Sequence, residues 1–356
     1  MTIAIAPTNI AILKYWGKNP AWEEYFIPTK SSLSFTPKGL ETRTEVLAER
    51  KKGDSSAIAF SLNGKGMPAG RPEHSYLLDF LARVGRFYPF VLDYDYEIES
   101  SNNFPTAAGF ASSASGFAAL AKAMAGELDE FAPIKDDDGR LSVLARLGSG
   151  SAARSMPSDG GFVEWRRGLD FDDRRSPASL SESELEEAVF SSSAKSLFGY
   201  RHWRDFTLIY CKVKEEEKKV KSRGGMKSSV ESSPNYASWV EREEGETRRR
   251  MIEAVREKDF EALAPLIMES SDSLHRICES TKPPLHYLDE TSRKIIRAVR
   301  SMNDGEAKAA YTFDAGPNAV VFTLNKHGKE VSETLGELLG PDALIATTLG
   351  PGARLI

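Results

Sequence analysis

Residues 100–126 read SSNNFPTAAGFASSASGFAALAKAMAG, and this stretch gives the first indication of the fold. Its first half holds turn-forming and small residues, whereas its second half is rich in alanine and favours a helix. The preceding residues 94–99 alternate apolar with acidic side chains and predict a half-exposed strand. The expected order is therefore strand, loop and helix N-terminus.

The loop in this stretch can bind an anion. Backbone N–H groups at a helix start form a positive concavity in which a phosphate sits without a charged side chain. Ser112 and Ser113 add hydroxyl donors or reach a phosphate-bound Mg²⁺. A tight turn followed by a helix cap explains the same residues, so both interpretations stay open. The loop is neither G-x-G-x-x-G nor Walker A, which excludes those two families.

The rest of the chain mixes strand and helix signals without strict βαβ alternation, which favours an α+β fold. The Asn63-Gly64 pair predicts a turn. Apolar residues at helical or alternating spacing predict helices at 71–87, 242–257, 259–275, 287–302 and 328–339, and strands at 42–50, 57–62, 206–213, 308–313, 319–324 and 343–347.

Length and charge narrow the classes of function. At 356 residues the chain exceeds one ordinary core, so we expect two lobes sharing a ligand-binding cleft. The polar stretch 167–195 suggests lobes of residues 1–185 and 186–356. With 47 Lys+Arg against 52 Asp+Glu the net charge is −5, which argues against nucleic acid or an anionic membrane as partner. No apolar run approaches a membrane span, and the N-terminus lacks a secretion signal, so we expect a cytoplasmic protein.

Cysteines and histidines do not suggest metal chemistry. Cys211 and Cys278 lack metal-ligand spacing and are too few for a disulfide framework, so we expect reduced, partly buried thiols. The histidines lack the i, i+4 spacing of a helical metal site and are interpreted as structural; they are His74, His202, His275, His286 and His327.

Residues 9–18, NIAILKYWGK, bring two lysines close together. In an extended segment Lys14 and Lys18 project to the same face and could clamp a phosphate. Exposed lysines beside a buried aromatic pair would give the same pattern.

Two further segments carry charged residues at suggestive places. Arg154 lies near Ser149 and Ser151 between glycines, which suits a bidentate grip on a carboxylate or phosphate, although a surface salt bridge is an equal explanation. Asp314 precedes Gly-Pro at the end of a predicted strand, where it would point into a cleft or cap a turn.

Taken together, these segments resemble the diphosphomevalonate decarboxylase family of the GHMP kinase superfamily. The similarity runs along most of the chain and rests on five phrases in the family's order: NIAILKYWGK (9–18), NNFPTAAGFASSASGFAAL (102–120), GSGSAARS…GGFVEW (148–165), KKVKSRGGM (218–226) and AYTFDAGPNA (310–319). The resemblance implies a GHMP kinase-like fold of two lobes, a ribosomal S5 domain 2-like N-terminal lobe and a GHMP C-terminal α/β-sandwich lobe. It also implies that ATP, Mg²⁺ and a small anionic phosphorylated mevalonate meet between them.

The resemblance also implies roles for individual residues. Asp314 would orient or deprotonate the substrate 3-hydroxyl, and Lys14 would stabilise the phosphate in transfer. Arg154 and Asn9 would hold the carboxylate. The 5-phosphate or diphosphate would be bound by Tyr15, Lys18, Ser149, Ser151 and Arg223, with Arg71 as a weaker candidate. The ATP phosphates would lie on Pro105, Ala108, Gly109, Ala111, Ser112 and Ser113, with Ser112 reaching Mg²⁺.

Two departures from the family pattern leave the substrate open. Residues 19–32 are longer than the family's usual link and place Lys30 where Asn is customary, and ARSMPSDGG carries two extra residues. The first hypothesis is ATP-dependent decarboxylation of mevalonate 5-diphosphate. Decarboxylation of 5-phosphomevalonate, or ATP-independent decarboxylation of mevalonate 3,5-bisphosphate, is the alternative. A mevalonate-type kinase and a non-enzymatic homologue come last, because Lys14, Arg154 and Asp314 are all present. A homodimer is a base-rate expectation, and the charged segment 214–225 suits a lid.

Overall fold

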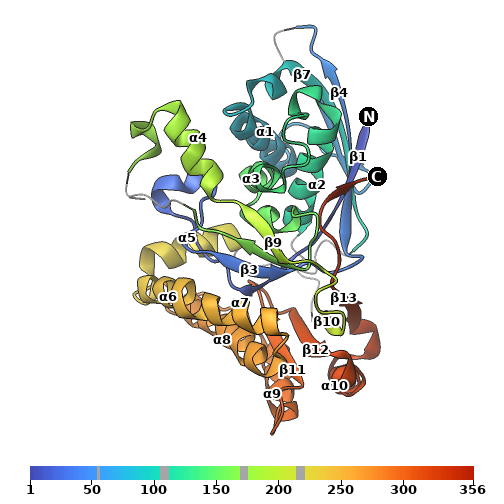
Figure 1. Cartoon of the computed structure of the whole chain (residues 1–356), viewed down its shortest axis with the longest axis vertical. Coiled ribbons are helices and arrows are strands. Elements are labelled where there is room, and N and C mark those ends of the chain that lie inside the picture. The colour runs from blue at the N-terminus through green and yellow to red at the C-terminus, as the bar shows by residue number, and fades with distance from the viewer. Residues whose placement is uncertain (54–56, 105–111, 169–174, 214–220) are drawn as a thin grey trace.

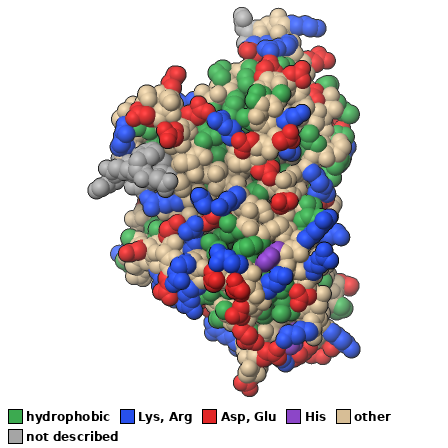
Figure 2. All heavy atoms as spheres, viewed as in Figure 1, with side chains coloured by type: hydrophobic (Ala, Val, Ile, Leu, Met, Phe, Trp, Pro, Cys, Tyr) green, Lys and Arg blue, Asp and Glu red, His purple; other side chains and the backbone are tan. Residues whose placement is uncertain are grey.

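A computed structural model describes the chain except residues 54–56, 105–111, 169–174 and 214–220. In its described part the strands form one six-stranded and two four-stranded sheets, arranged as an upper and a lower half in Figure 1. The predicted α+β class and the two-lobed arrangement are confirmed. Figure 2 shows acidic and basic side chains interspersed over one face, in keeping with the small net charge. No described helix is long and apolar enough to cross a membrane.

The six-stranded sheet builds most of the upper half. Its order is β14 (Arg354–Leu355), β1 (Thr2–Pro7), β4 (Glu41–Arg50), β7 (Tyr94–Asn102), β5 (Ile58–Leu62) and β6 (Lys65–Gly66), and only the β5–β7 pair is parallel. Because β14 pairs with β1, the two chain ends lie side by side (Figure 1). The alternation predicted for residues 94–99 is confirmed: Tyr96 and Ile98 are buried, whereas Glu97 and Glu99 are exposed.

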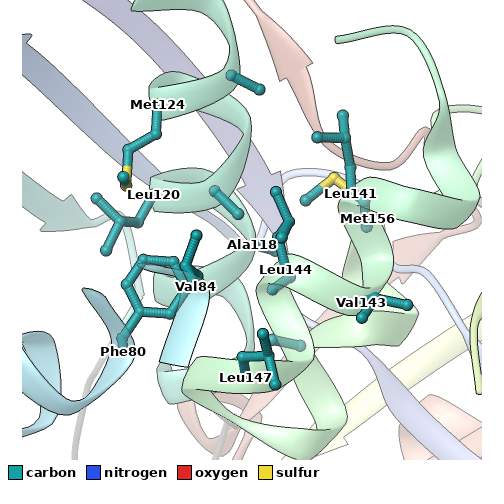
Figure 3. Packing of buried hydrophobic residues seen from close by; sticks show 14 of the residues in the cluster. Phe80, Val84, Ala118, Leu120, Met124, Leu141, Val143, Leu144, Leu147 and Met156 are labelled. Atoms are coloured by element: carbon teal, nitrogen blue, oxygen red, sulfur yellow. The ribbon is translucent and has the colours of Figure 1, made fainter. Parts of the chain in front are cut away.

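Helices α1 (Pro72–Gly85), α2 (Ser112–Glu127) and α3 (Asp138–Gly148) form a helical layer beside this sheet. Small alanines let α2 lie close to β1 and β4. Figure 3 shows Phe80 and Val84 of α1 packed with Leu120 of α2. The helical spacing of α1 therefore fills the core that the sheet leaves open.

A second sheet runs through the middle of the molecule. Its order is β2 (Ile10–Leu13), β3 (Ser32–Phe35), β8 (Phe162–Trp165) and β9 (Ala194–Phe198), all antiparallel. The predicted lobe division between residues 185 and 186 falls inside α4 (Glu182–Ser191). Because β9 pairs with β8, we propose that the N-terminal lobe extends to Phe198 and that the chain changes lobe between β9 and β10.

The third sheet, β11 (Ala309–Phe313), β12 (Ala319–Leu324), β10 (Phe206–Cys211) and β13 (Leu344–Thr348), is antiparallel. One face packs on α9 (Glu290–Met302) and α10 (Asn325–Leu339), through residues such as Ile209 and Val321. The other face meets α7 (Arg248–Glu257), α8 (Phe260–Glu279) and the middle sheet. There Phe35 lies 4.7 Å from both Phe206 and Phe322, measured between ring centroids, and joins the two lobes.

The predicted elements are largely confirmed, with two differences. The helix predicted over 242–257 begins with the last residue of α6 (Tyr236–Arg242) and a π-helical turn, Glu243–Thr247, and is α-helical only from Arg248, in α7. The last residues of the segment predicted as a lid, 214–225, are helical, because α5 (Ser222–Ser232) begins at Ser222. Residues 214–220 of that segment lie outside the described part of the chain. Both cysteines are buried and free, as predicted.

Candidate functional site

A cavity of about 730 Å³ lies between the lobes. The N-terminal lobe contributes the ends of its strands, the start of α2 and the turn after α3, and the C-terminal lobe contributes α5 and the end of β11. The predicted site residues that line it are Asn9, Tyr15, Lys18, Ser112, Ser113, Ser149, Ser151, Arg154, Arg223 and Asp314. Folding therefore gathers residues separated by as much as 305 positions around one space.

Asp314 lines this cavity and forms an ion pair with Lys14, which is buried behind it and does not itself line the cavity. The Lys14 Nζ lies 2.6 Å from Asp314 Oδ1, the lysine is 1% exposed and the carboxylate is 42% exposed. Burial lowers the pKa of Lys14, and the Asp314 charge opposes that shift. The alternative interpretation of residues 9–18, in which the lysines are exposed beside a buried aromatic pair, is therefore wrong for Lys14. The pair places a buried cation behind a carboxylate that faces the cavity, which is the arrangement needed to hold a hydroxyl group beside a transferring phosphate.

Arg154 is buried and held from two sides. Its Nε donates to Asn9 Oδ1 at 3.0 Å, and its Nη1 donates to Ser32 Oγ at 3.0 Å. Asn9 in turn donates from Nδ2 to Ser155 Oγ at 2.7 Å. Burial lowers the pKa of Arg154 to about 10, with Asp314 opposing the shift. A surface salt bridge is therefore excluded, and the guanidinium is fixed in orientation at the cavity wall.

Three cations surround the ring of Phe26 at one end of the cavity. The ring centroid lies 4.3 Å from Lys18 Nζ, 5.1 Å from Arg83 Cζ and 5.6 Å from Arg223 Cζ. Arg83 and Arg223 also donate to the carbonyls of Leu147 and Gly148, the last residues of α3. This set of residues, Lys18, Arg83 and Arg223, is called the cationic cluster below.

Arg83 was not predicted from the sequence. Helical spacing places it on the same face of α1 as Tyr76, which lines the cavity. Nothing local in the sequence indicates that this face meets Lys18. Conversely, Arg71 is exposed at the N-cap of α1 and does not line the cavity, so its binding role stays a prediction.

A largely apolar part of the cavity lies between the six-stranded sheet, α1 and α2. Its apolar lining consists of Phe60, Leu62, Tyr76, Leu77, Ile98, Phe117 and Leu120. This apolar part adjoins the cationic cluster at Tyr76, whose ring centroid lies 4.6 Å from Arg223 Cζ. Ser112 and Ser113 lie at the first turn of α2, where Ser113 Oγ is 3.2 Å from Ser149 Oγ. The other predicted phosphate-loop residues, Pro105, Ala108, Gly109 and Ala111, lie outside the described residues.

A buried ion pair behind the site was also missed from the sequence. Lys30 Nζ lies 3.7 Å from Glu243 Oε2, and both side chains are buried. Burial lowers the pKa of Lys30 to about 8, with Glu243 opposing the shift. Ser270 Oγ donates to Glu243 at 2.8 Å and accepts from the Lys14 backbone N–H at 3.2 Å. The pair therefore supports the backbone that carries Lys14.

Gly17 shows why the lysine segment needs a glycine. Its φ is +126°, and a Cβ there would lie 1.8 Å from the Tyr236 hydroxyl. That hydroxyl donates to the Trp16 carbonyl at 2.6 Å. The close approach of Tyr236 fixes the backbone between Lys14 and Lys18.

Comparisons with known proteins agree with this geometry. Residues 6–178 match the family described as "Diphosphomevalonate decarboxylase-like N-terminal domain", and residues 208–350 match "Mevalonate 5-diphosphate decarboxylase C-terminal domain". The chain is 37% identical to the Rattus norvegicus diphosphomevalonate decarboxylase, over 91% of this chain and 77% of the relative. It is 35% identical to the Candida albicans enzyme, over 98% of this chain and 96% of the relative.

Solved structures give the same result. The mevalonate diphosphate decarboxylase from Staphylococcus aureus superposes with a TM-score of 0.85 at 31% identity, covering 100% of this chain and 97% of that one. A structure described as "MDDEF in complex with MVAPP, AMPPCP and Magnesium" superposes with a TM-score of 0.83 at 32% identity, covering 100% and 98%. The family matches, the relatives and the solved structures agree: this chain belongs to the diphosphomevalonate decarboxylase family.

Proposed function

We propose that this chain catalyses the ATP-dependent decarboxylation of mevalonate 5-diphosphate to isopentenyl diphosphate. The observation that carries the proposal is the Lys14–Asp314 pair, whose carboxylate lines the same cavity as Arg154 and the Lys18 and Arg223 members of the cationic cluster. A 3-hydroxy acid that also carries a 5-diphosphate presents a hydroxyl, a carboxylate and a phosphate chain. The cavity offers a separate partner for each of these groups.

The first step is phosphorylation of the 3-hydroxyl. Hydroxide is a poor leaving group, so the oxygen must first be converted to a phosphate ester. Asp314 accepts the hydroxyl proton while that oxygen attacks the γ-phosphorus of ATP and the bond to ADP breaks. Lys14 stabilises the negative charge on the transferring group from its buried position.

The second step is loss of phosphate and CO₂. The C3–O bond breaks and inorganic phosphate leaves with the bonding electrons, which builds positive charge on the tertiary carbon. The electron pair of the bond to the carboxylate then forms the new double bond and releases CO₂. Arg154, fixed by Asn9 and Ser32, holds the carboxylate in line for this step. Its orientation therefore matters more than its charge.

The nucleotide fits the remaining part of the cavity. The apolar part suits an adenine ring, and the first turn of α2 with Ser112 and Ser113 suits the phosphates. Mg²⁺ bound to the phosphates would neutralise part of their charge, and the Ser112 hydroxyl would reach it. The similar structure that contains AMPPCP and magnesium supports the proposal that this chain binds ATP and Mg²⁺.

A second candidate substrate is 5-phosphomevalonate. The observation that favours it is an ion pair between Lys18 and Glu23, because an internal carboxylate already occupies a lysine proposed to bind the phosphate chain. A monophosphate demands less positive charge than a diphosphate does.

Product analysis tests the proposal. The protein is incubated with mevalonate 5-diphosphate, 5-phosphomevalonate or mevalonate 3,5-bisphosphate, with and without ATP-Mg²⁺, while CO₂ and ADP are measured. We expect equal amounts of CO₂ and ADP from the diphosphate. CO₂ without ADP would rule out the ATP-dependent reaction, ADP without CO₂ would leave a kinase, and neither product would indicate a non-enzymatic homologue.

Two further expectations concern the protein as a whole. We propose that it forms a homodimer, on the base rate stated above, and that it acts in the cytoplasm. Light scattering of the purified protein tests the first, and fractionation of the source cells tests the second.

A further inference from the structure

The most informative feature outside the proposed chemistry is the Lys18–Glu23 ion pair. Lys18 Nζ lies 3.2 Å from Glu23 Oε1, with the lysine 13% exposed and the carboxylate 49% exposed. Within the described part of the chain, Glu23 is the carboxylate that pairs with Lys18. Burial lowers the pKa of Lys18 and the Glu23 charge opposes that shift. Glu23 therefore supports the lysine charge and also competes with any anion that Lys18 would bind.

Glu23 is presented by a rigid piece of backbone. It lies in a short 3₁₀ segment, Pro20–Tyr25, in which Trp22 and Tyr25 on either side are fully buried. Asn19 caps the start by accepting from Ala21 N–H at 3.0 Å. At the other end the Phe26 N–H donates to the Glu23 carbonyl at 3.1 Å. A phosphate that approaches Lys18 therefore approaches a carboxylate whose backbone cannot swing away.

The charges around this end of the cavity are nearly balanced. Lys18, Arg83 and Arg223 supply three positive charges around Phe26. Glu23 pairs with Lys18, and Asp79 pairs with Arg83 at 3.7 Å. The cluster and its two acids thus carry a net charge of +1, from three cations minus two carboxylates. Because Glu23 and Asp79 offset part of the positive charge, each negative charge on a substrate is attracted less strongly than it would be by the three cations alone.

We infer that Glu23 is a specificity-determining residue that lowers the preference of the site for a 5-diphosphate relative to a 5-monophosphate. This inference rests on the proposed function, because it assigns the cationic cluster to the 5-phosphate chain. The physical reason is neutralisation of Lys18: Glu23 offsets the lysine charge, and a diphosphate, which carries more negative charge than a monophosphate, loses more attraction from that offset. The extra residues of the 19–32 segment supply the support on which Glu23 stands.

The test compares Glu23→Gln with Glu24→Gln. Glu24 is the matched control, since it is the next acid on the same segment and acts electrostatically on Arg83 but makes no ion pair with Lys18 in the described structure. The ratio of kcat/KM for mevalonate 5-diphosphate to that for 5-phosphomevalonate is measured with ATP-Mg²⁺. For Glu23→Gln we expect the ratio to rise about five-fold, the size of one unit charge acting across several ångströms of a partly screened site. For Glu24→Gln we expect less than a two-fold change.

A second measurement separates failure of the inference from failure of the proposed function. Dissociation constants for the two esters are measured by calorimetry, which needs no turnover. An unchanged ratio in Glu23→Gln, or equal changes in both variants, would overturn the role of Glu23 even if the wild-type protein releases CO₂. If the wild-type protein binds the esters without releasing CO₂, the proposed reaction fails and the binding ratio still decides the inference. If it binds neither ester, both fail.

Lys18 provides an internal check. If Glu23 acts through this lysine, adding Lys18→Met to Glu23→Gln should abolish most of the five-fold gain, since the lysine charge that Glu23 offsets is then absent. A gain that persists in the double variant would assign the effect to general charge and overturn the proposed contact.

Discussion

Replacing Lys30 by methionine is expected to destabilise the fold far more than replacing both members of its ion pair. In Lys30→Met, the Glu243 carboxylate stays buried without its cation, and its Oε1 already lacks a hydrogen-bond partner. Removal of one partner of a buried ion pair typically costs about 3–5 kcal/mol. In Lys30→Met/Glu243→Gln no buried charge remains and Ser270 can still donate to the amide oxygen, so we expect a cost of roughly 1 kcal/mol relative to wild type.

Equilibrium urea unfolding at pH 7 measures the difference. Trp239 reports directly on the pair, because Lys30 Nζ lies 4.7 Å from its ring. Lys227→Met is the control: its pairing with Glu231 is exposed, so we expect a change within about 0.5 kcal/mol.

Two results would refute the reasoning about this pair. One is a cost for Lys30→Met no larger than that of the Lys227→Met control. The other is a double variant whose cost equals the sum of those of Lys30→Met and Glu243→Gln, because coupled charges must give non-additive costs. Since Ser270 links Glu243 to the Lys14 backbone, Lys30→Met should also lower kcat in the fraction that remains folded.

Three further predictions concern single residues. Asp314→Asn should lower kcat by about 10²–10⁴-fold because the proton acceptor is lost, while calorimetry should show substrate binding largely kept; near-normal turnover would remove Asp314 from the mechanism. Lys18→Ala should raise KM about ten-fold with little change in kcat, a sign of binding common to ground and transition states; a fall in kcat at constant KM would contradict that role. Burial, followed by the nearby Lys14 charge, lowers the pKa of His275 to about 4, so the unfolded state binds more protons between pH 4 and 6.5. The stabilisation is present above about pH 6.5 and lost as the pH falls to 4, by about 3 kcal/mol. His275→Asn should flatten that part of the stability profile measured by urea unfolding, and equal slopes in the two proteins would show that another group titrates.

Local patterns in the sequence were sufficient to predict most of the secondary structure. The alternation at 94–99 and the helical spacing in 71–87 follow from which side chains must leave water, and each needs only neighbouring residues. The same holds for the strand and the helix on either side of residues 105–111. The family resemblance pointed to Lys14, Arg154 and Asp314, and their catalytic roles stay predictions.

Tertiary structure decided how those residues meet. Nothing near Lys14 in the chain indicates that its amine lies 2.6 Å from a carboxylate 300 residues away. The place of Arg83 beside Lys18, and the burial of Lys30 against Glu243, depend on how α1 and the π-helical turn pack on the middle sheet. Periodicity fixes which face of an element is buried, but the partner of that face is set by the packing of distant elements, where shape and charge are matched across the whole chain.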